Sequence, residues 1–201
     1  METPQVVQTP MQTRKVVSHR KKTLKRSIHK LYPTNTVTDD TILEESIPVL
    51  FEIFNKYAPV SKISLPYRNF YDIGSGLGKV VICMAKQHSF LKTIGVESSS
   101  EKVIIANTAL NKIRDEGLRK RIEFYCISNT DSTLNYANAC WILLSEEDHN
   151  SVIDKLVFEV KSGCIIVSFK QIYNSNFNQI NYVSLPTNTL VDSKVYVYAK
   201  I

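Results

Sequence analysis

Hydrophobic and polar positions follow two different periods along most of the chain. Short apolar runs of strand length span 70–73, 93–96, 122–127, 140–144 and 164–169. Apolar residues at helical spacing predict helices over 39–57, 79–87, 100–114 and 150–160. Ser98 to Ser100 are the expected N-cap of the third of these helices. Buried strands that alternate with amphipathic helices predict an α/β fold, doubly wound, with a mostly parallel sheet covered on both faces.

The C-terminal part of the chain departs from this alternation. Residues 181–185 and 194–199 have strand patterns and are joined by a Pro-Thr-Asn turn region, with no helix between them. Two strands joined in this way pair antiparallel. We therefore predict an antiparallel C-terminal hairpin at one end of the sheet.

The segment 70–78 predicts a site for a nucleoside cofactor. It joins a strand to a helix through a turn with glycine at alternate positions, and the next strand ends in Glu97. Glycines allow close approach of a ligand, and a strand-end carboxylate suits ribose hydroxyls. A nucleotide phosphate loop is excluded, because Ile73 and Val80 stand where it needs glycine and a hydroxyl. A dinucleotide turn is excluded by Lys79, where it needs glycine.

Composition favours one globular domain. The chain has 201 residues, 43% hydrophobic and 22% charged, and no apolar run approaches the roughly 20 residues that a membrane helix needs. We expect a soluble intracellular protein, in nucleus or cytoplasm, with no membrane span. The four cysteines form no C-x-x-C pair and lie in apolar patterns, so we interpret them as reduced core residues. A metal site completed by His88 or His149 lacks the usual ligand spacing, and no metal is expected.

Positive charge is concentrated at the N-terminus. Residues 1–30 carry eight Lys or Arg against Glu2, a net +7, whereas the remainder carries 17 against 18 acidic residues, a net −1. With few large apolar residues, the segment 1–30 is predicted to be a disordered tail when unbound. Its cluster 19–26 fits a nuclear-import signal or a nucleic-acid-binding arm as well as it fits a solvated tail, and a mitochondrial presequence is the weakest alternative.

The motif Asp72-x-Gly74-x-Gly76-x-Gly78, with Glu97 on the next strand, resembles the class I S-adenosylmethionine-dependent methyltransferases. The resemblance implies a Rossmann-like sheet of seven strands and S-adenosylmethionine as cofactor. It also implies that Glu97 binds both ribose hydroxyls. The cofactor-binding residues expected around the turn and the second strand are Asp72, Gly74, Ser75, Gly76, Gly78, Glu97 and Ser98.

A closer resemblance covers about residues 32–199. Tyr32-Pro33-Thr34, the glycine turn, Gly95-Val96-Glu97 and the run 163–168 look like the disruptor-of-telomeric-silencing histone lysine methyltransferases and their small protein-lysine methyltransferase relatives. In these families a loop before the first helix closes over the cofactor, and a carboxylate after the third strand reads the adenine amino group. By position, these roles fall to Tyr32, Thr34, Thr36, Asp131 and Ser132.

The same resemblance implies methyl transfer to a protein lysine, in a domain spanning 31–201. Ser145 and Glu146 are expected near the reacting amine, with Tyr32 as the third catalytic candidate, whereas Glu147 and Asp148 are interpreted as an acidic first helical turn. The Asn/Asp-Pro-Pro-Tyr-like motif that grips base amino groups is absent after the fourth strand. The histone enzymes have Tyr-Gly-Glu in place of Tyr32-Pro33-Thr34.

The histone enzymes also carry paired asparagines where this chain has Leu144-Ser145. The alternatives are therefore a catalytically inactive cofactor-binding protein and an RNA or small-molecule methyltransferase. The expected partners are a protein with an accessible lysine, histone or another basic protein, and nucleosomal DNA or RNA bound by residues 14–30.

Overall fold

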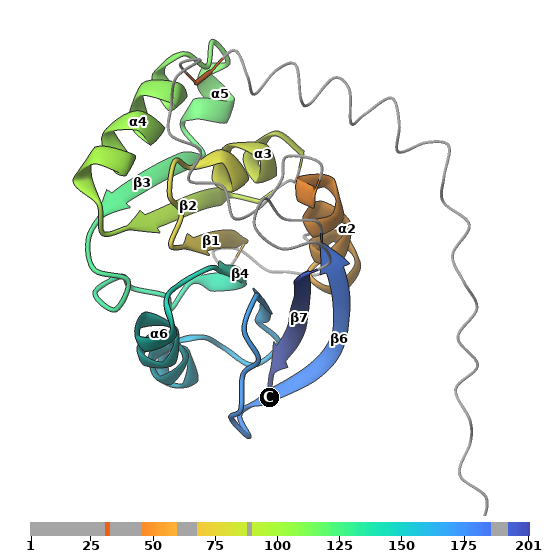
Figure 1. Cartoon of the computed structure of the whole chain (residues 1–201). Coiled ribbons are helices and arrows are strands. Elements are labelled where there is room, and N and C mark those ends of the chain that lie inside the picture. The colour runs from red at the N-terminus through yellow and green to blue at the C-terminus, as the bar shows by residue number, and fades with distance from the viewer. Residues whose placement is uncertain (1–30, 33–45, 60–67, 88–89, 186–192) are drawn as a thin grey trace, which may run out of the picture.

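The computed structural model describes residues 31–32, 46–59, 68–87, 90–185 and 193–201, and the statements below concern these residues. Figure 1 shows the strands side by side, flanked by helices. In chain order the elements are α2 (Ile47–Tyr57), β1 (Asn69–Ile73), α3 (Lys79–Gln87), β2 (Lys92–Glu97), α4 (Ser100–Asn111), α5 (Glu116–Arg119), β3 (Ile122–Cys126), β4 (Ala137–Ile142), α6 (Glu146–Glu159), β5 (Ile165–Ser168), β6 (Phe177–Leu185) and β7 (Ser193–Lys200).

The strands form one sheet in the order β3-β2-β1-β4-β5-β7-β6. The first five are parallel, and β7 runs antiparallel to both β5 and β6. The predicted seven-stranded, mostly parallel sheet with an antiparallel C-terminal hairpin is thereby confirmed. The chain builds outward from β1 in one direction through β2 and β3, then in the other through β4 and β5. The carboxyl ends of β1 and β4 therefore border a topological switch point, where α/β sheets bind ligands.

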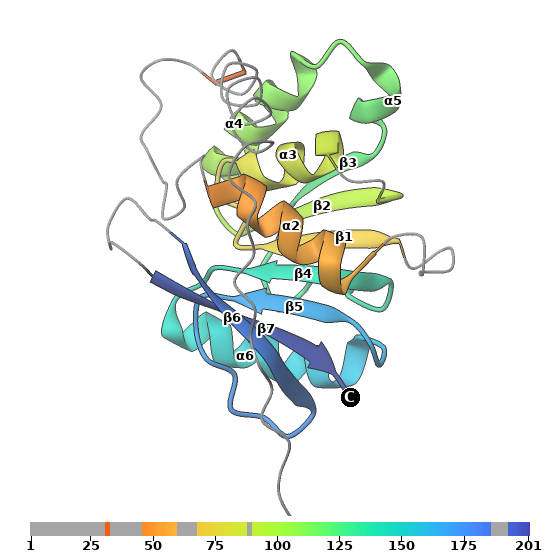
Figure 2. The same ribbon diagram turned by 90° about the vertical axis from the view of Figure 1, so that its right-hand side faces the viewer.

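Helices cover both faces of the sheet. Figure 2 shows α2 on one side and α6 on the opposite side. Successive residues of β1 point into different cores. Phe70 packs in the cluster that contains residues of α2 and α3, whereas Tyr71 packs in the cluster that contains residues of α6. This alternation follows from the two-residue period of a strand. Asp72 continues on the Phe70 face, at the carboxyl end of β1, where a polar side chain meets the ligand-binding edge.

Helix α6 begins earlier than predicted. The hydroxyl of Ser145 accepts a hydrogen bond from the Asp148 N–H at 3.2 Å, so the helix starts at Glu146 rather than near Asn150. The buried ring of His149 then contacts the Ser168 hydroxyl at 2.9 Å (Nε2 to Oγ), which ties the start of α6 to the end of β5. Burial lowers the pKa of His149, so the neutral imidazole is favoured in this contact.

Other boundaries also differ from the sequence interpretation. Strand β4 begins at Ala137 and ends at Ile142, and the short helix α5 was not predicted. The expected N-cap of α4 is confirmed: Ser99 accepts from the Lys102 N–H. The interpretation of all four cysteines as core residues is wrong for Cys126, which is exposed on the edge strand β3. The predicted helical residues 39–45 lie outside the described part.

The described residues contain neither a metal-ligand group nor a membrane-spanning helix. Among them, no group of three or more His, Cys, Asp or Glu side chains is arranged to hold a metal ion. None of the helices found in these ranges has both the length and the apolar character that crossing a membrane requires.

Candidate functional site

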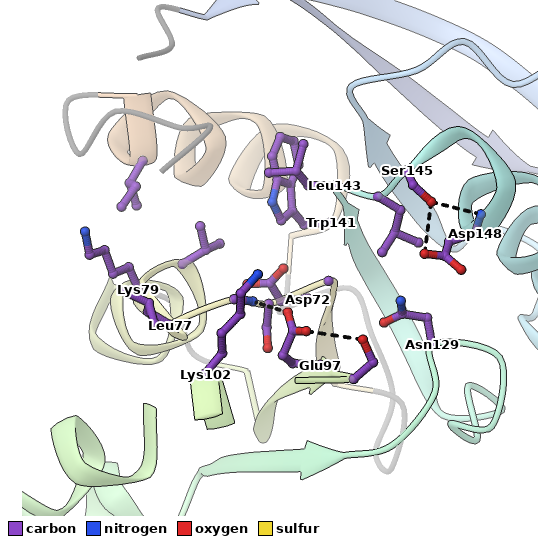
Figure 3. Close-up of a pocket in the computed structure, with 17 residues that line it drawn as sticks. Asp72, Leu77, Lys79, Glu97, Lys102, Asn129, Trp141, Leu143, Ser145 and Asp148 are labelled. Atoms are coloured by element: carbon purple, nitrogen blue, oxygen red, sulfur yellow. Dashed lines mark hydrogen bonds between the residues drawn. The ribbon is translucent and has the colours of Figure 1, made fainter. Parts of the chain in front are cut away.

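A cavity of about 400 Å³ lies at the switch point of the sheet. It is lined by residues at the carboxyl ends of β1, β2 and β4, by the turn before α3, and by the first turn of α6. Figure 3 shows that Lys79 and Leu77 lie on one side of the cavity and Ser145 and Asp148 on the other. Seven predicted site residues line it: Asp72, Gly74, Ser75, Gly76, Glu97, Ser98 and Ser145.

The glycine turn has a backbone that other residues rarely adopt. Gly74, Gly76 and Gly78 have φ angles of 82°, 52° and 77°. Their surroundings are also tight: a Cβ on Gly74 would lie 2.4 Å from the Leu143 carbonyl oxygen, and one on Gly78 would lie 2.4 Å from the Phe124 ring. Gly78 does not line the cavity, so in this structure it shapes the turn and its packing on β3.

Glu97 fastens this turn to the end of β2. One carboxylate oxygen accepts from the Gly76 N–H at 2.9 Å, and the other accepts from the Ser99 N–H at 2.9 Å and the Ser98 hydroxyl at 3.4 Å. The side chain is 7% exposed. A carboxylate has about four acceptor positions. Glu97 therefore keeps capacity for a ligand hydroxyl at the cavity wall.

Asp72 lies beside Glu97 at the base of the cavity (Figure 3). It is 1% exposed, and its Oδ1 has no hydrogen-bond partner. Burial, together with repulsion from the Glu97 charge, raises the pKa of Asp72 well above its ordinary value. A cationic ligand group in the cavity would oppose both effects, because it favours the ionised carboxylate.

The segment after β3 places its side chains differently from the expectation. Asp131 is exposed and Ser132 is buried with its hydroxyl donating to the Asn129 carbonyl at 3.3 Å, and neither lines the cavity. Asn129 lines it instead: the residue is 7% exposed, and its Oδ1 has no hydrogen-bond partner. Figure 3 shows the amide of Asn129 directed into the cavity. The sequence analysis did not single out Asn129, although it lies two residues before Asp131 and its side-chain oxygen is also a hydrogen-bond acceptor.

The segment after β4 forms the opposite wall. Leu143, Leu144, Ser145 and Asp148 line the cavity, whereas Glu146 does not. The Glu146 carboxylate is exposed and accepts from the Lys170 ammonium at 2.8 Å, which lowers its pKa. The sequence indicated only an acidic first helical turn for Asp148. Asp148 is therefore, after Asn129, a second cavity residue that the sequence did not reveal.

Trp141 reaches the cavity from β4 while remaining part of the core. It is buried, lines the cavity, and packs edge-on against Phe169 with ring centroids 5.6 Å apart. A core position and a place in the ligand wall therefore coincide in this residue.

Tyr32 supports the site without lining it. Its hydroxyl donates to the Leu77 carbonyl at 3.0 Å, and the Lys79 ammonium lies 5.6 Å from its ring centroid. Leu77 belongs to the glycine turn and lines the cavity. The structure therefore links Tyr32 to the turn rather than to the reacting end. Thr34 and Thr36 lie outside the described residues.

Comparison with known proteins gives a match to part of a family model and a set of structures with the same fold. The sequence model of the family described as "Histone methylation protein DOT1" matches residues 44–140, just under half of the chain. This range runs from the residues before α2 into β4 and includes the glycine turn, Glu97 and Asn129. Curated protein sequences give no match.

Several solved structures with the same fold are methyltransferases. An RNA methyltransferase from Salinibacter ruber, in complex with S-adenosyl-L-homocysteine, has TM-score 0.58 and 19% identity over 76% of this chain and 90% of its own. The methyltransferase domain of a bacterial CtHen1 has TM-score 0.55 and 11% identity over 77% and 97%. Precorrin-6y C5,15-methyltransferase from Geobacter metallireducens has TM-score 0.53 and 13% identity over 85% and 92%.

These findings support a class I methyltransferase with S-adenosylmethionine as its cofactor. The cavity fits this cofactor. Buried acceptors without partners at Asp72 and Asn129 suit its ammonium and its adenine amino group, and the spare capacity of Glu97 suits ribose hydroxyls.

Proposed function

We propose that this chain transfers a methyl group from S-adenosylmethionine to a lysine side chain of a protein. The observation that carries the proposal is the match of residues 44–140 to a family of histone methylation proteins, because this stretch contains most of the cavity-forming residues. Residues 31–201 form the catalytic domain in this proposal, and residues 1–30, with their net +7, are a separate basic arm.

The proposed cofactor contacts follow from the polar groups of the cavity. Glu97 binds the ribose hydroxyls, and Asn129 accepts a hydrogen bond from the adenine amino group in place of Asp131. Asp72 faces the ammonium of the cofactor. The support for these roles is that all three side chains line the cavity, and that Asp72 and Asn129 each keep a buried oxygen without a partner. A buried acceptor of this kind costs free energy until a ligand donor reaches it.

The residues of the turn and of β4 align the acceptor with the methyl group of the cofactor. When bound, the cofactor supplies an electrophilic methyl group on a sulfonium. The cavity then has to hold the acceptor nitrogen in line with that carbon and exclude water. The apolar side chains of Trp141, Leu143 and Leu144 favour the neutral amine that this reaction needs, because desolvation lowers the pKa of an amine.

The wall after β4 argues for an aliphatic amine rather than a base amino group. It presents the side chains of Leu143, Leu144 and Ser145, and it lacks the amide and proline carbonyls that grip a planar amino group. The acceptor end is therefore suited to an unbranched side chain that threads between apolar walls.

The decisive experiment measures which molecule receives the methyl group. The full chain is incubated with methyl-labelled S-adenosylmethionine and core histones, total protein or total RNA, and labelled proteins are mapped by mass spectrometry. Label on a lysine side chain supports the proposal. Label on RNA alone overturns it, and cofactor binding without any transfer, seen by titration calorimetry, identifies a binding protein without catalysis.

RNA methylation is the second candidate, because the segment 1–30 is strongly basic and the Salinibacter ruber structure is an RNA methyltransferase. A chain lacking residues 1–30 separates the roles of the two parts. If the segment anchors DNA or RNA, its removal reduces methylation of nucleosomes or RNA and spares free lysine peptides. Equal loss on all substrates would contradict an anchoring role.

A further inference from the structure

The first turn of α6 carries three consecutive acids, and the structure gives them different surroundings. Glu146 is paired with Lys170 at 2.8 Å. Glu147 is exposed and does not line the cavity. Asp148 is also exposed, but it lines the cavity, and no described lysine or arginine forms an ion pair with it. Because successive helical residues point about 100° apart, only one of the three acids, Asp148, faces the cavity.

The charges of the cavity wall are separated. Lys79 and Lys102 also line the cavity, and Figure 3 shows their ammonium groups on the side away from Asp148. Asp148 therefore gives the end of the cavity next to α6 a negative charge. The oxygen of Asn129, which is buried and has no partner, points into the same cavity and can accept an N–H donor of a ligand, the adenine amino group in the proposed function.

We propose that Asp148 is a specificity-determining residue that selects a cationic aliphatic amine as methyl acceptor. This inference rests on the proposed function and names the recognition step. The incoming lysine ammonium pairs with the Asp148 carboxylate at the cavity wall. A base amino group carries no such charge, so it gains nothing from this contact.

Transfer then proceeds from the neutral amine. As the side chain passes Leu144 toward Trp141, desolvation lowers the amine pKa and the ammonium loses one proton to solvent. The nitrogen lone pair forms the new C–N bond while the methyl carbon–sulfur bond breaks and its electron pair stays on sulfur. The product is a methylated ammonium, and Asp148 again faces a cation.

Asp148 also has a capping role, and the test must separate the two roles. The Ser145 hydroxyl accepts from the Asp148 N–H and donates to its carboxylate at 3.0 Å. Asp148→Asn removes the charge but keeps both hydrogen bonds, since an amide oxygen also accepts. Glu147→Gln is the matched control, because it removes one charge from the same helical turn outside the cavity.

The experiment uses the full chain saturated with S-adenosylhomocysteine and n-butylammonium as a probe of the lysine side chain, with 1-butanol as the uncharged isostere. Amide resonances of the first turn of α6 are followed by NMR during each titration. We expect n-butylammonium to bind better than 1-butanol. Asp148→Asn should weaken n-butylammonium about two- to fivefold, and Glu147→Gln should leave it unchanged. Thermal unfolding confirms that both variants are folded.

The inference is overturned if 1-butanol binds as well as n-butylammonium, if n-butylammonium does not bind, or if both variants behave alike. Its failure is distinct from that of the proposed function. Lysine methylation with an unchanged KM in Asp148→Asn would sink only the inference, whereas n-butylammonium binding without lysine methylation by the wild-type chain would sink the function and leave only the contact between Asp148 and a cation. A raised KM with unchanged kcat supports both.

Discussion

The carboxylate of Glu97 accepts the backbone N–H of Gly76 at 2.9 Å, so the end of β2 holds the turn that follows β1. The same carboxylate also accepts the N–H of Ser99, the N-cap of α4. One side chain therefore connects the cofactor turn, the second strand and the next helix. Because these hydrogen bonds already hold the Glu97 carboxylate in place, a ligand that binds to it costs little side-chain conformational entropy.

Replacing Glu97 should weaken both the turn and the cofactor site. In Glu97→Gln, the amide nitrogen faces an N–H where the wild-type chain has an acceptor. We expect affinity for S-adenosylmethionine to fall about tenfold or more, and the free energy of unfolding to fall by roughly 2 kcal/mol, because hydrogen bonds to a charged acceptor contribute about 1.5–3 kcal/mol. Calorimetry and urea unfolding measure the two effects.

Glu101→Gln is the control for charge alone, since Glu101 is an exposed acid in the first turn of α4. It should leave the cofactor affinity within twofold of the wild-type value. Equal effects of the two substitutions would show that the bonds of Glu97 to Gly76 and Ser99 are not what supports the site.

Gly78 and Gly163 separate backbone strain from side-chain clash. Both have positive φ, 77° and 85°, but a Cβ on Gly78 meets the Phe124 ring at 2.4 Å, whereas nothing lies within 4 Å of one on Gly163. Gly163→Ala should cost about 1–2 kcal/mol of unfolding free energy from the left-handed backbone alone. Gly78→Ala should cost at least about 1 kcal/mol more, because of overpacking.

Cofactor binding distinguishes the same two variants. Gly78→Ala displaces the turn that lines the cavity and should reduce S-adenosylmethionine affinity, while Gly163→Ala, in the turn between α6 and β5, should not. Chemical unfolding and calorimetry provide the comparison. A Gly78→Ala protein no less stable than Gly163→Ala would mean that the Phe124 contact relaxes without cost.

The parts of the site that could be predicted depend on local patterns. The strand, turn and helix around Gly74 follow from glycine spacing and apolar periodicity within one short segment. Glu97 lies beside this turn because β1 and β2 are parallel neighbours, whose carboxyl ends lie at the same edge of the sheet. Tertiary packing decides the remainder. After β3 the chain has no periodic pattern, so the inward position of Asn129 and the outward position of Asp131 depend on tertiary packing.

The start of α6 was misjudged for a related reason. Its first turn consists of acids without an apolar period, and only the Ser145 cap marks it. A shift of one residue in a helix start turns the side chains by about 100°. The choice between Glu146 and Asp148 as the cavity residue therefore depends on a boundary that the polar pattern does not determine.

Tyr32 should affect cofactor binding through the turn. Tyr32→Phe removes only the hydroxyl that donates to the Leu77 carbonyl, and we expect S-adenosylmethionine to bind roughly two- to tenfold more weakly, the effect of one lost hydrogen bond. Tyr173→Phe is the control, because that hydroxyl is exposed and bonds to Gln171 far along the chain from the turn. Unchanged affinity in Tyr32→Phe would remove this residue from the cofactor machinery.

Asp72 should make the stability of the cofactor-free protein depend on pH. Burial and Glu97 raise its folded-state pKa above the ordinary 3.8, so the folded chain retains a proton that the unfolded chain releases. The stability that this group contributes is present below its unfolded pKa and is lost as pH rises toward the folded pKa, by up to about 1.4 kcal/mol per pH unit. Asp72→Asn removes this term, so we expect a variant that becomes increasingly more stable than the wild-type protein as pH rises from 4. Saturating S-adenosylmethionine, which is cationic, should reduce the difference in unfolding free energy between Asp72→Asn and the wild-type protein. Urea unfolding from pH 4 to 7, with and without cofactor, measures it, and a constant difference between the two proteins across this range would show that Asp72 does not titrate in this way.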